Sequence, residues 1–224
     1  MDKAGSPARR QEEAAQDKPA PRKRGPKVDV ELTRQRRADI TREAANLFDK
    51  VGYHRVNMEM IAEAAGLKKP TLYHYVAGKE EILFRMQESM MLPLRERLNE
   101  RIAAGMDTMS ILRGIYEDIF RNLHDSPGTV RSFFEHQRDV GPEREAEIRK
   151  QRVEFTAQVM KIISDGMDAG IINRADVRLM TLCFFGVANW AYQWYRPGRD
   201  PEPEVIAGQC FDIFARGMAA RPAG

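Results

Sequence analysis

The sequence predicts an all-α protein. Over most of its 224 residues, apolar side chains recur three or four positions apart, which is the repeat of a helix with one buried face. Prolines and glycines separate these stretches, and no alternating apolar and polar pattern of a strand lies between them. Hydrophobic residues make up 42% of the chain, which is ample for a buried core.

The N-terminal segment is expected not to fold. Residues 1–30 are rich in Ala, Pro, Lys, Arg and Glu and have no apolar periodicity, which predicts a disordered basic tail. Residues 21–27 read PRKRGPK, and this Arg-Gly-Pro core between cations is similar to arms such as the AT-hook that lie in the DNA minor groove. A tail that only improves solubility is the alternative interpretation.

The folded part is predicted to begin with a helix over residues 33–51, which Gly52 ends. Residues 57–79 then read as two short helices joined by a tight turn. Asn57 is the expected N-cap of the first, and Gly66 permits the left-handed turn that closes it. The second is expected to start at Pro70, because the first amides of a helix have no intrahelical partner.

The second short helix carries side chains suited to a DNA major groove, provided that Leu72 faces the core. We expect phosphate contacts from Lys68, Lys69 and Lys79, groove and backbone contacts from Thr71, Tyr73, His74 and Tyr75, and a phosphate contact from Asn57 beside its capping role. Positive charge is concentrated in the part of the chain that includes these two helices. Residues 18–79 hold 14 Lys and Arg against 7 Asp and Glu, and the remainder is slightly acidic.

Residues 35–83 resemble the DNA-binding domain of TetR-family transcriptional regulators. The motifs that carry the resemblance are AANLF from position 44, VGY from 51, IAEAAGL from 61, TLYHY from 71 and KEEIL from 79. The resemblance implies a helix-turn-helix domain over residues 31–78, an effector-binding and dimerisation domain over 79–224, and a homodimer on a palindromic double-stranded operator. Two departures are Lys68 in place of a capping serine or threonine, and Val76 with Gly78 in place of phenylalanine and serine.

A long connecting helix is predicted over residues 79–103, with Pro93 expected to kink or split it. Further helices are predicted over residues 107–124, 127–140, 143–169, 176–195 and 202–218. The last two are apolar on more than one face, which favours a four-helix dimer interface built from two helices of each subunit. Its expected contacts are Val187, Trp190, Trp194, Ile206, Cys210 and Ile213, and a single larger core is the alternative.

The middle helices are predicted to enclose an effector cavity. The expected lining is Tyr116, Phe120, Phe134, Phe155, Val159 and Phe184, with Gln137 and Asn189 as polar anchors. Residues 189–207, NWAYQWYRPGRDPEPEVIA, are similar to the end of TetR-family repressors of lipid and steroid breakdown, whose inducers are acyl-CoA thioesters. The similarity implies repression relieved by an acyl-CoA or another bulky hydrophobic effector. Alternatively, these residues only end a helix, or the protein represses an efflux gene and binds aromatic drugs through Glu117 or Glu135.

Other function classes find little support in the sequence. The four histidines, at positions 54, 74, 124 and 136, show no spacing of a catalytic or metal site, so we expect no enzyme, cofactor or metal. Cys183 and Cys210 lie in apolar patterns and are expected to be buried thiols. No run approaches the roughly 20 apolar residues that span a bilayer, so no membrane association and a cytoplasmic location are expected.

Overall fold

The computed structural model describes residues 30–218, which form helices and connecting loops without strands; the basic tail predicted for residues 1–30 lies almost entirely outside the described residues. The N-terminal elements are α1 (Val30–Val51), η1 (Tyr53–Arg55), α2 (Met58–Ala64) and α3 (Lys69–Leu72), which we call the head. The body that follows consists of α4 (Lys79–Ala103), α5 (Thr108–Asp125), α6 (Pro127–Glu135), α7 (Pro142–Asp168), α8 (Val177–Trp190), η2 (Ala191–Gln193) and α9 (Pro203–Met218).

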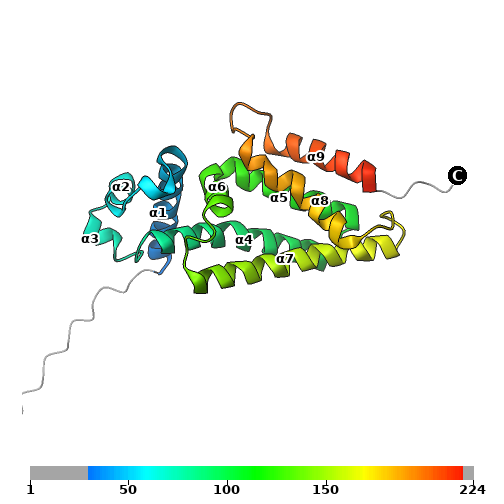
Figure 1. Cartoon of the computed structure of the whole chain (residues 1–224), viewed down its shortest axis with the longest axis horizontal. Coiled ribbons are helices and arrows are strands. Elements are labelled where there is room, and N and C mark those ends of the chain that lie inside the picture. The colour runs from blue at the N-terminus through cyan, green and yellow to red at the C-terminus, as the bar shows by residue number, and fades with distance from the viewer. Residues whose placement is uncertain (1–29, 219–224) are drawn as a thin grey trace, which may run out of the picture.

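The head lies at one end of an elongated molecule, and α4 leads from it into the body (Figure 1). Figure 1 shows α4 and α7 side by side along one edge of the body and α9 along the opposite edge, with α8 between them and running toward the end of α7. The sequence predicts that Pro93 kinks or splits the connecting helix, and the split is wrong, because α4 runs as one helix from Lys79 to Ala103 with Pro93 inside it; the kink stays a prediction. The head is therefore joined to the body by a single continuous helix of 25 residues.

The joint between head and body is closely packed where α6 crosses α1. Gly128 of α6 faces the backbone of Ala45 in α1, and a Cβ atom at this glycine would lie 2.4 Å from the Ala45 carbonyl oxygen. An ion pair of 3.2 Å between Arg131 and Asp49 links the same two helices. Absence of a side chain at position 128 is thus what allows the two helices to approach this closely.

The core of the body is aromatic. Tyr116 and Phe120 of α5 pack with Phe184 of α8 and Phe211 of α9, and all four side chains are buried. Beside them Asp118 is only 1% exposed, and its carboxylate accepts hydrogen bonds from Arg97 (3.1 Å) and Arg101 (2.6 Å). Because a buried carboxylate is costly without such donors, these arginines fix the packing of α4 on α5.

Three local expectations from the sequence differ from the structure. The helix predicted to reach residue 140 ends at Glu135, because the chain turns at His136 toward Gly141, whose φ of 86° precedes α7. The helix predicted to reach residue 195 ends at Trp190 and continues only as the short η2. Cys183 is exposed on the single chain and Cys210 is half-buried, so neither is the fully buried thiol that was expected. No helix in residues 30–218 is both long and apolar enough to cross a membrane.

Candidate DNA-binding surface and effector cavity

The turn between α2 and α3 is built as the sequence predicts. Asn57 caps α2, since its side-chain oxygen accepts hydrogen bonds from the backbone amides of Glu59 (2.9 Å) and Met60 (3.0 Å). Gly66 then adopts a φ of 65°, the left-handed conformation that a glycine enters without strain. These two residues fix where α2 begins and where the chain turns toward α3.

Helix α3 and the turn that follows it, residues 73–75, present polar and aromatic groups to solvent, while Leu72 anchors the helix in the core with no exposed surface. Lys68, Lys69, Tyr73 and His74 are exposed, and Thr71 and Tyr75 are half-buried. Lys68 occupies the N-cap position without a side-chain hydrogen bond, as its departure from the TetR pattern predicts. Lys69 lies 3.7 Å from Glu59 in an exposed ion pair, which is weak enough to be exchanged for a DNA phosphate.

Two cations, Arg37 and Lys79, donate hydrogen bonds to backbone carbonyl groups of the head. Arg37 of α1 donates a hydrogen bond from Nε to the carbonyl oxygen of Tyr75 at 3.0 Å, a contact that sequence reasoning missed. Lys79 donates to the carbonyl oxygens of Tyr53 and Val56, both at 2.7 Å, and its ammonium lies 4.3 Å from the Tyr53 ring centroid. Burial lowers the pKa of Lys79, partly offset by Asp139. Lys79 therefore supports the head itself, and only its third N–H is left for the expected phosphate.

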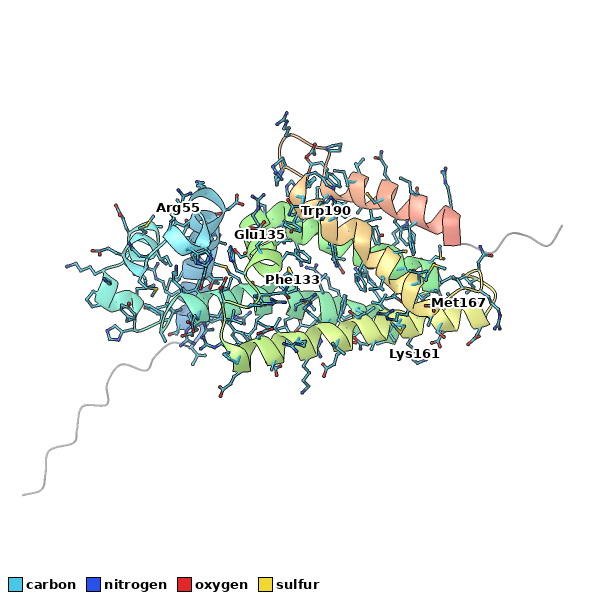
Figure 2. All side chains as sticks on the ribbon, viewed as in Figure 1. Arg55, Phe133, Glu135, Lys161, Met167 and Trp190 are labelled. Carbon is cyan, nitrogen blue, oxygen red and sulfur yellow. The ribbon has the colours of Figure 1, made fainter. Side chains whose placement is uncertain are left out.

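A cavity of about 210 Å³ lies inside the body. Its lining comes from α4 to α8: Met90, Met91, Leu94, Ile119, Asn122, Leu123, Val130, Phe133, Phe134, Arg152, Phe155, Thr156, Leu182, Phe185, Ala188 and Asn189. Figure 2 shows Phe133 in the interior of the body. The set is mostly apolar, with a few polar groups that converge from different helices, as ligand pockets usually are.

The predicted effector residues divide into two groups. Phe134, Phe155 and Asn189 line the cavity. Their contact with an effector bound there stays a prediction. The prediction is wrong for the others as cavity lining. Tyr116, Phe120, Val159 and Phe184 are fully buried in the core, and the Tyr116 hydroxyl donates to the Phe184 carbonyl oxygen at 2.6 Å. Gln137 lies outside the lining and accepts a hydrogen bond from Arg152.

Arg152 is the charged group of the cavity, and it was not among the predicted residues. Its guanidinium lies 5.3 Å from the Phe133 ring centroid and donates to the neutral side chain of Gln137. Burial lowers the pKa of Arg152, and no ion pair found within residues 30–218 includes it. The sequence did hold a signal: Arg152 interrupts the apolar stripe of α7 formed by Ile148, Phe155 and Val159.

A second hollow follows α7 and shares residues with the cavity. It has a volume of about 400 Å³ and is lined by Arg149, Arg152, Val153, Thr156, Ala157 and Met160. Arg152 and Thr156 belong to both hollows, so the cavity and this groove are neighbours along one helix. Arg149 and Arg152 lie one helical turn apart in this groove, Arg149 in an exposed ion pair with Glu145 at 2.9 Å and Arg152 without a carboxylate partner among residues 30–218.

The outer face of α8 and α9 is apolar and exposed. Of the predicted dimer contacts, Trp190 is 62% exposed and Ile213 is 76% exposed, and Val187 and Trp194 are also on the surface. Ile206 is a correction, because it is buried within the chain, whereas Cys210 is half-buried and its place in a dimer interface stays a prediction. The exposed stripe of α9 instead starts at Val205, and Leu179 and Leu182 extend the face along α8. An apolar face of this extent marks an interaction surface.

The exposed helix after a glycine turn, on a head joined to an all-α body with a cavity, defines a helix-turn-helix DNA-binding regulator. Residues 40–86 match the family described as bacterial regulatory proteins, tetR family, and residues 107–218 match the tetracyclin repressor-like, C-terminal domain. The chain belongs to the TetR family of transcriptional regulators, which confirms the resemblance seen in the sequence.

Named relatives and solved structures extend over most of the chain. It is 26% identical over 187 residues to the HTH-type transcriptional repressor KstR2 of Rhodococcus jostii (strain RHA1), covering 83% of this chain and 92% of that protein. It is 26% identical to the HTH-type transcriptional activator FasR of Mycolicibacterium smegmatis, covering 70% and 72% of the two chains.

Two solved structures share the fold. The ketosteroid transcriptional regulator KstR2 of Mycobacterium tuberculosis has a TM-score of 0.77 at 20% identity and covers 83% of this chain and 96% of its own. AibR in complex with isovaleryl coenzyme A and operator DNA has a TM-score of 0.70 at 23% identity, with 80% and 97% covered. At these identities the two structures establish the fold alone.

Proposed function

We propose that this protein is a dimeric repressor that leaves its operator when an acyl thioester, or another amphipathic anion of that kind, occupies the cavity beside α7. The observation that carries the proposal is Arg152, a partly buried cation in an apolar cavity with no carboxylate partner among the described residues. A charge in such a place is costly unless an opposite charge joins it. An anionic ligand supplies that charge.

The sign of the charge separates this proposal from the drug-binding alternative. A cavity for cationic aromatic drugs needs an acidic contact, yet neither Glu117 nor Glu135 belongs to the cavity lining. The lining offers Arg152, Asn122, Thr156 and Asn189 as its polar groups, which suit carboxylate, thioester or phosphate oxygens. The cavity therefore favours an anionic or carbonyl-bearing ligand over a cation.

The volumes suggest how a coenzyme A ester is divided between the two hollows. The inner cavity, at about 210 Å³, is smaller than the roughly 300–1,000 Å³ of pockets that hold whole drug-sized ligands. It fits a short acyl chain, and the larger coenzyme part then lies in the neighbouring groove beside Arg149 and Arg152. AibR, a protein of the same fold, binds isovaleryl coenzyme A together with operator DNA, which is consistent with this class of ligand.

The dimer and the direction of regulation complete the proposal. One head presents a single short recognition helix, so specific binding to a palindrome requires two heads, and the exposed face of α8 and α9 supplies the contact between subunits. KstR2, a relative that matches most of this chain, is named a transcriptional repressor, and this supports repression as the direction of regulation. The ligand relieves repression only if it binds more tightly to the conformation whose heads do not match the operator.

The binding test uses isovaleryl-CoA as the probe and compares wild-type protein with Arg152→Met by calorimetry. Loss of a charged hydrogen bond costs about 1.5–3 kcal/mol, so the variant is expected to bind roughly ten to one hundred times more weakly. Lys161→Met, which removes a cation of the same helix outside both hollows, is the matched control and should leave the affinity unchanged. Equal affinity of wild type and Arg152→Met, or tighter binding of a cationic dye such as ethidium by wild type, would refute the proposal.

A further inference from the structure

Three metal-ligating side chains meet at the junction between head and body. His54 belongs to η1 of the head, His136 follows α6, and Asp139 lies in the loop before α7. One possible ligand atom from each of the three lies within 4.8 Å of the other two. In Figure 2, Arg55 and Glu135 are labelled and mark the chain neighbours of the two histidines on either side of this junction.

Aromatic packing and a hydrogen bond hold the three residues in place. The ring of His136 stacks on Tyr53 with centroids 4.8 Å apart, and the His54 ring meets it edge to face at 5.5 Å. Nδ1 of His136 lies 3.0 Å from a carboxylate oxygen of Asp139. Packing and hydrogen-bond contacts from both the head and the body therefore hold the three side chains in this arrangement.

Two imidazoles and one carboxylate are the donor set of many zinc sites that keep a fourth position for water or substrate. Bond lengths of about 2.0–2.2 Å to Zn²⁺ place tetrahedral ligand atoms about 3.4 Å apart, so the present spacing closes by small side-chain rotations. Soft thiolate ligands are absent from the three, which makes borderline ions such as Zn²⁺ or Co²⁺ the best match.

The electrostatic surroundings contain charges of both signs. Asp139 and Glu80 are the acidic groups that act on Tyr53 at this junction. The cation on this side is Lys79, whose ammonium is held by two backbone carbonyl oxygens and by the Tyr53 ring. A divalent cation between the histidines and Asp139 brings positive charge close to the carboxylates of Asp139 and Glu80, which favour it.

We propose that His54, His136 and Asp139 bind a divalent transition-metal ion, with Zn²⁺ as the best match, and that this ion ties the head to the body. His54 comes from the head and the other two ligands from the body, so the bound ion favours the head orientation described above over any other. His136 directly follows α6, which supplies Phe133 and Phe134 to the cavity. The ion is thus placed to bias the movement of the head. The proposal is independent of the effector's identity.

The test uses the full-length chain freed of metal with a chelator. Co²⁺ is added as the probe, because cobalt in a tetrahedral nitrogen and oxygen site gives characteristic visible absorption bands. We expect one Co²⁺ per chain and loss of the bands when Zn²⁺ is added. His54→Gln, His136→Gln and Asp139→Asn are each expected to weaken Co²⁺ binding by at least about tenfold, since even second-shell changes cost that much.

His74→Gln is the matched control, because His74 is another exposed histidine of the same head and is not one of the three ligands. Zn²⁺ should also raise the Tm of wild type in a concentration-dependent manner and leave His54→Gln unaffected. His54 is exposed, so this variant should fold and decides the test if the other two do not. Wild type without tetrahedral cobalt bands, or with the same affinity as His54→Gln, would show that the three residues make packing contacts only.

Discussion

Gly128→Ala tests whether the contact of α6 with α1 sets the position of the head. The added Cβ would lie 2.4 Å from the Ala45 carbonyl oxygen and 2.9 Å from its carbon, whereas ordinary contacts begin at 3.4 Å. The obstacle is backbone, so it cannot rotate away, and the two helices must separate by about 1 Å. Overpacking of this kind costs about 1–3 kcal/mol of unfolding free energy.

Urea denaturation of the variant should show that loss, and operator affinity should fall because the head is displaced relative to its partner across the dimer. Gly208→Ala in α9 is the matched control, since its Cβ would meet only the flexible Arg113 side chain at 3.5 Å. Replacing a helical glycine by alanine there should stabilise the protein by about 0.5–1 kcal/mol. If Gly128→Ala is as stable as Gly208→Ala and binds DNA like wild type, the reasoning about this joint is wrong.

Four further predictions concern single side chains. Asp118→Asn should lower the unfolding free energy in urea by about 2–4 kcal/mol. The loss is less than for a fully buried pair, because Arg97 is partly exposed, as is Arg121, whose guanidinium lies 3.6 Å from the same carboxylate; a loss below the error of the measurement would contradict it. Gln87→Met should raise Tm and add about 1–2 kcal/mol, because the buried Gln87 amide has no hydrogen-bond partner among the described residues; destabilisation would show that the amide is satisfied in solution. Tyr73→Ala should weaken operator binding in a mobility-shift titration without changing isovaleryl-CoA affinity, and a parallel loss of both would argue against separate sites. Ile213→Arg should convert the dimer to monomers by light scattering, and a persistent dimer would place the interface elsewhere.

The sequence predicts well the features that depend on local signals. The cap at Asn57, the turn at Gly66 and the buried Leu72 each follow from residue type and near neighbours, so these three features of the head could be anticipated. The bounds of α4 were also predicted, but an internal Pro93 did not divide it, because tertiary packing on both sides of the proline supports the helix.

The sequence is less informative about whether an apolar helix face lies in the core, lines a cavity or stays exposed. Tyr116 of α5 and Phe184 of α8 each lie on an apolar face of their helix, yet periodicity cannot distinguish a residue that lines a cavity from one in a filled core. In α9, both Ile206 and Ile213 lie on apolar stripes, and only the packing of α9 in the folded chain decides that one is buried and the other exposed. The meeting of His54 with His136 depends on how the head sits on the body, which no local pattern encodes.

If ligand in the cavity moves the head through the body, with Arg152 as the ligand's anchor, then release from DNA requires both the ligand and this side chain. The measurement is operator affinity with and without isovaleryl-CoA, for wild type and Arg152→Met, on a duplex selected by the protein from a random pool. Isovaleryl-CoA should weaken DNA binding by wild type and leave Arg152→Met on the DNA at the same concentration. Equal release of both proteins, or release of neither by any acyl-CoA chain length, would contradict it.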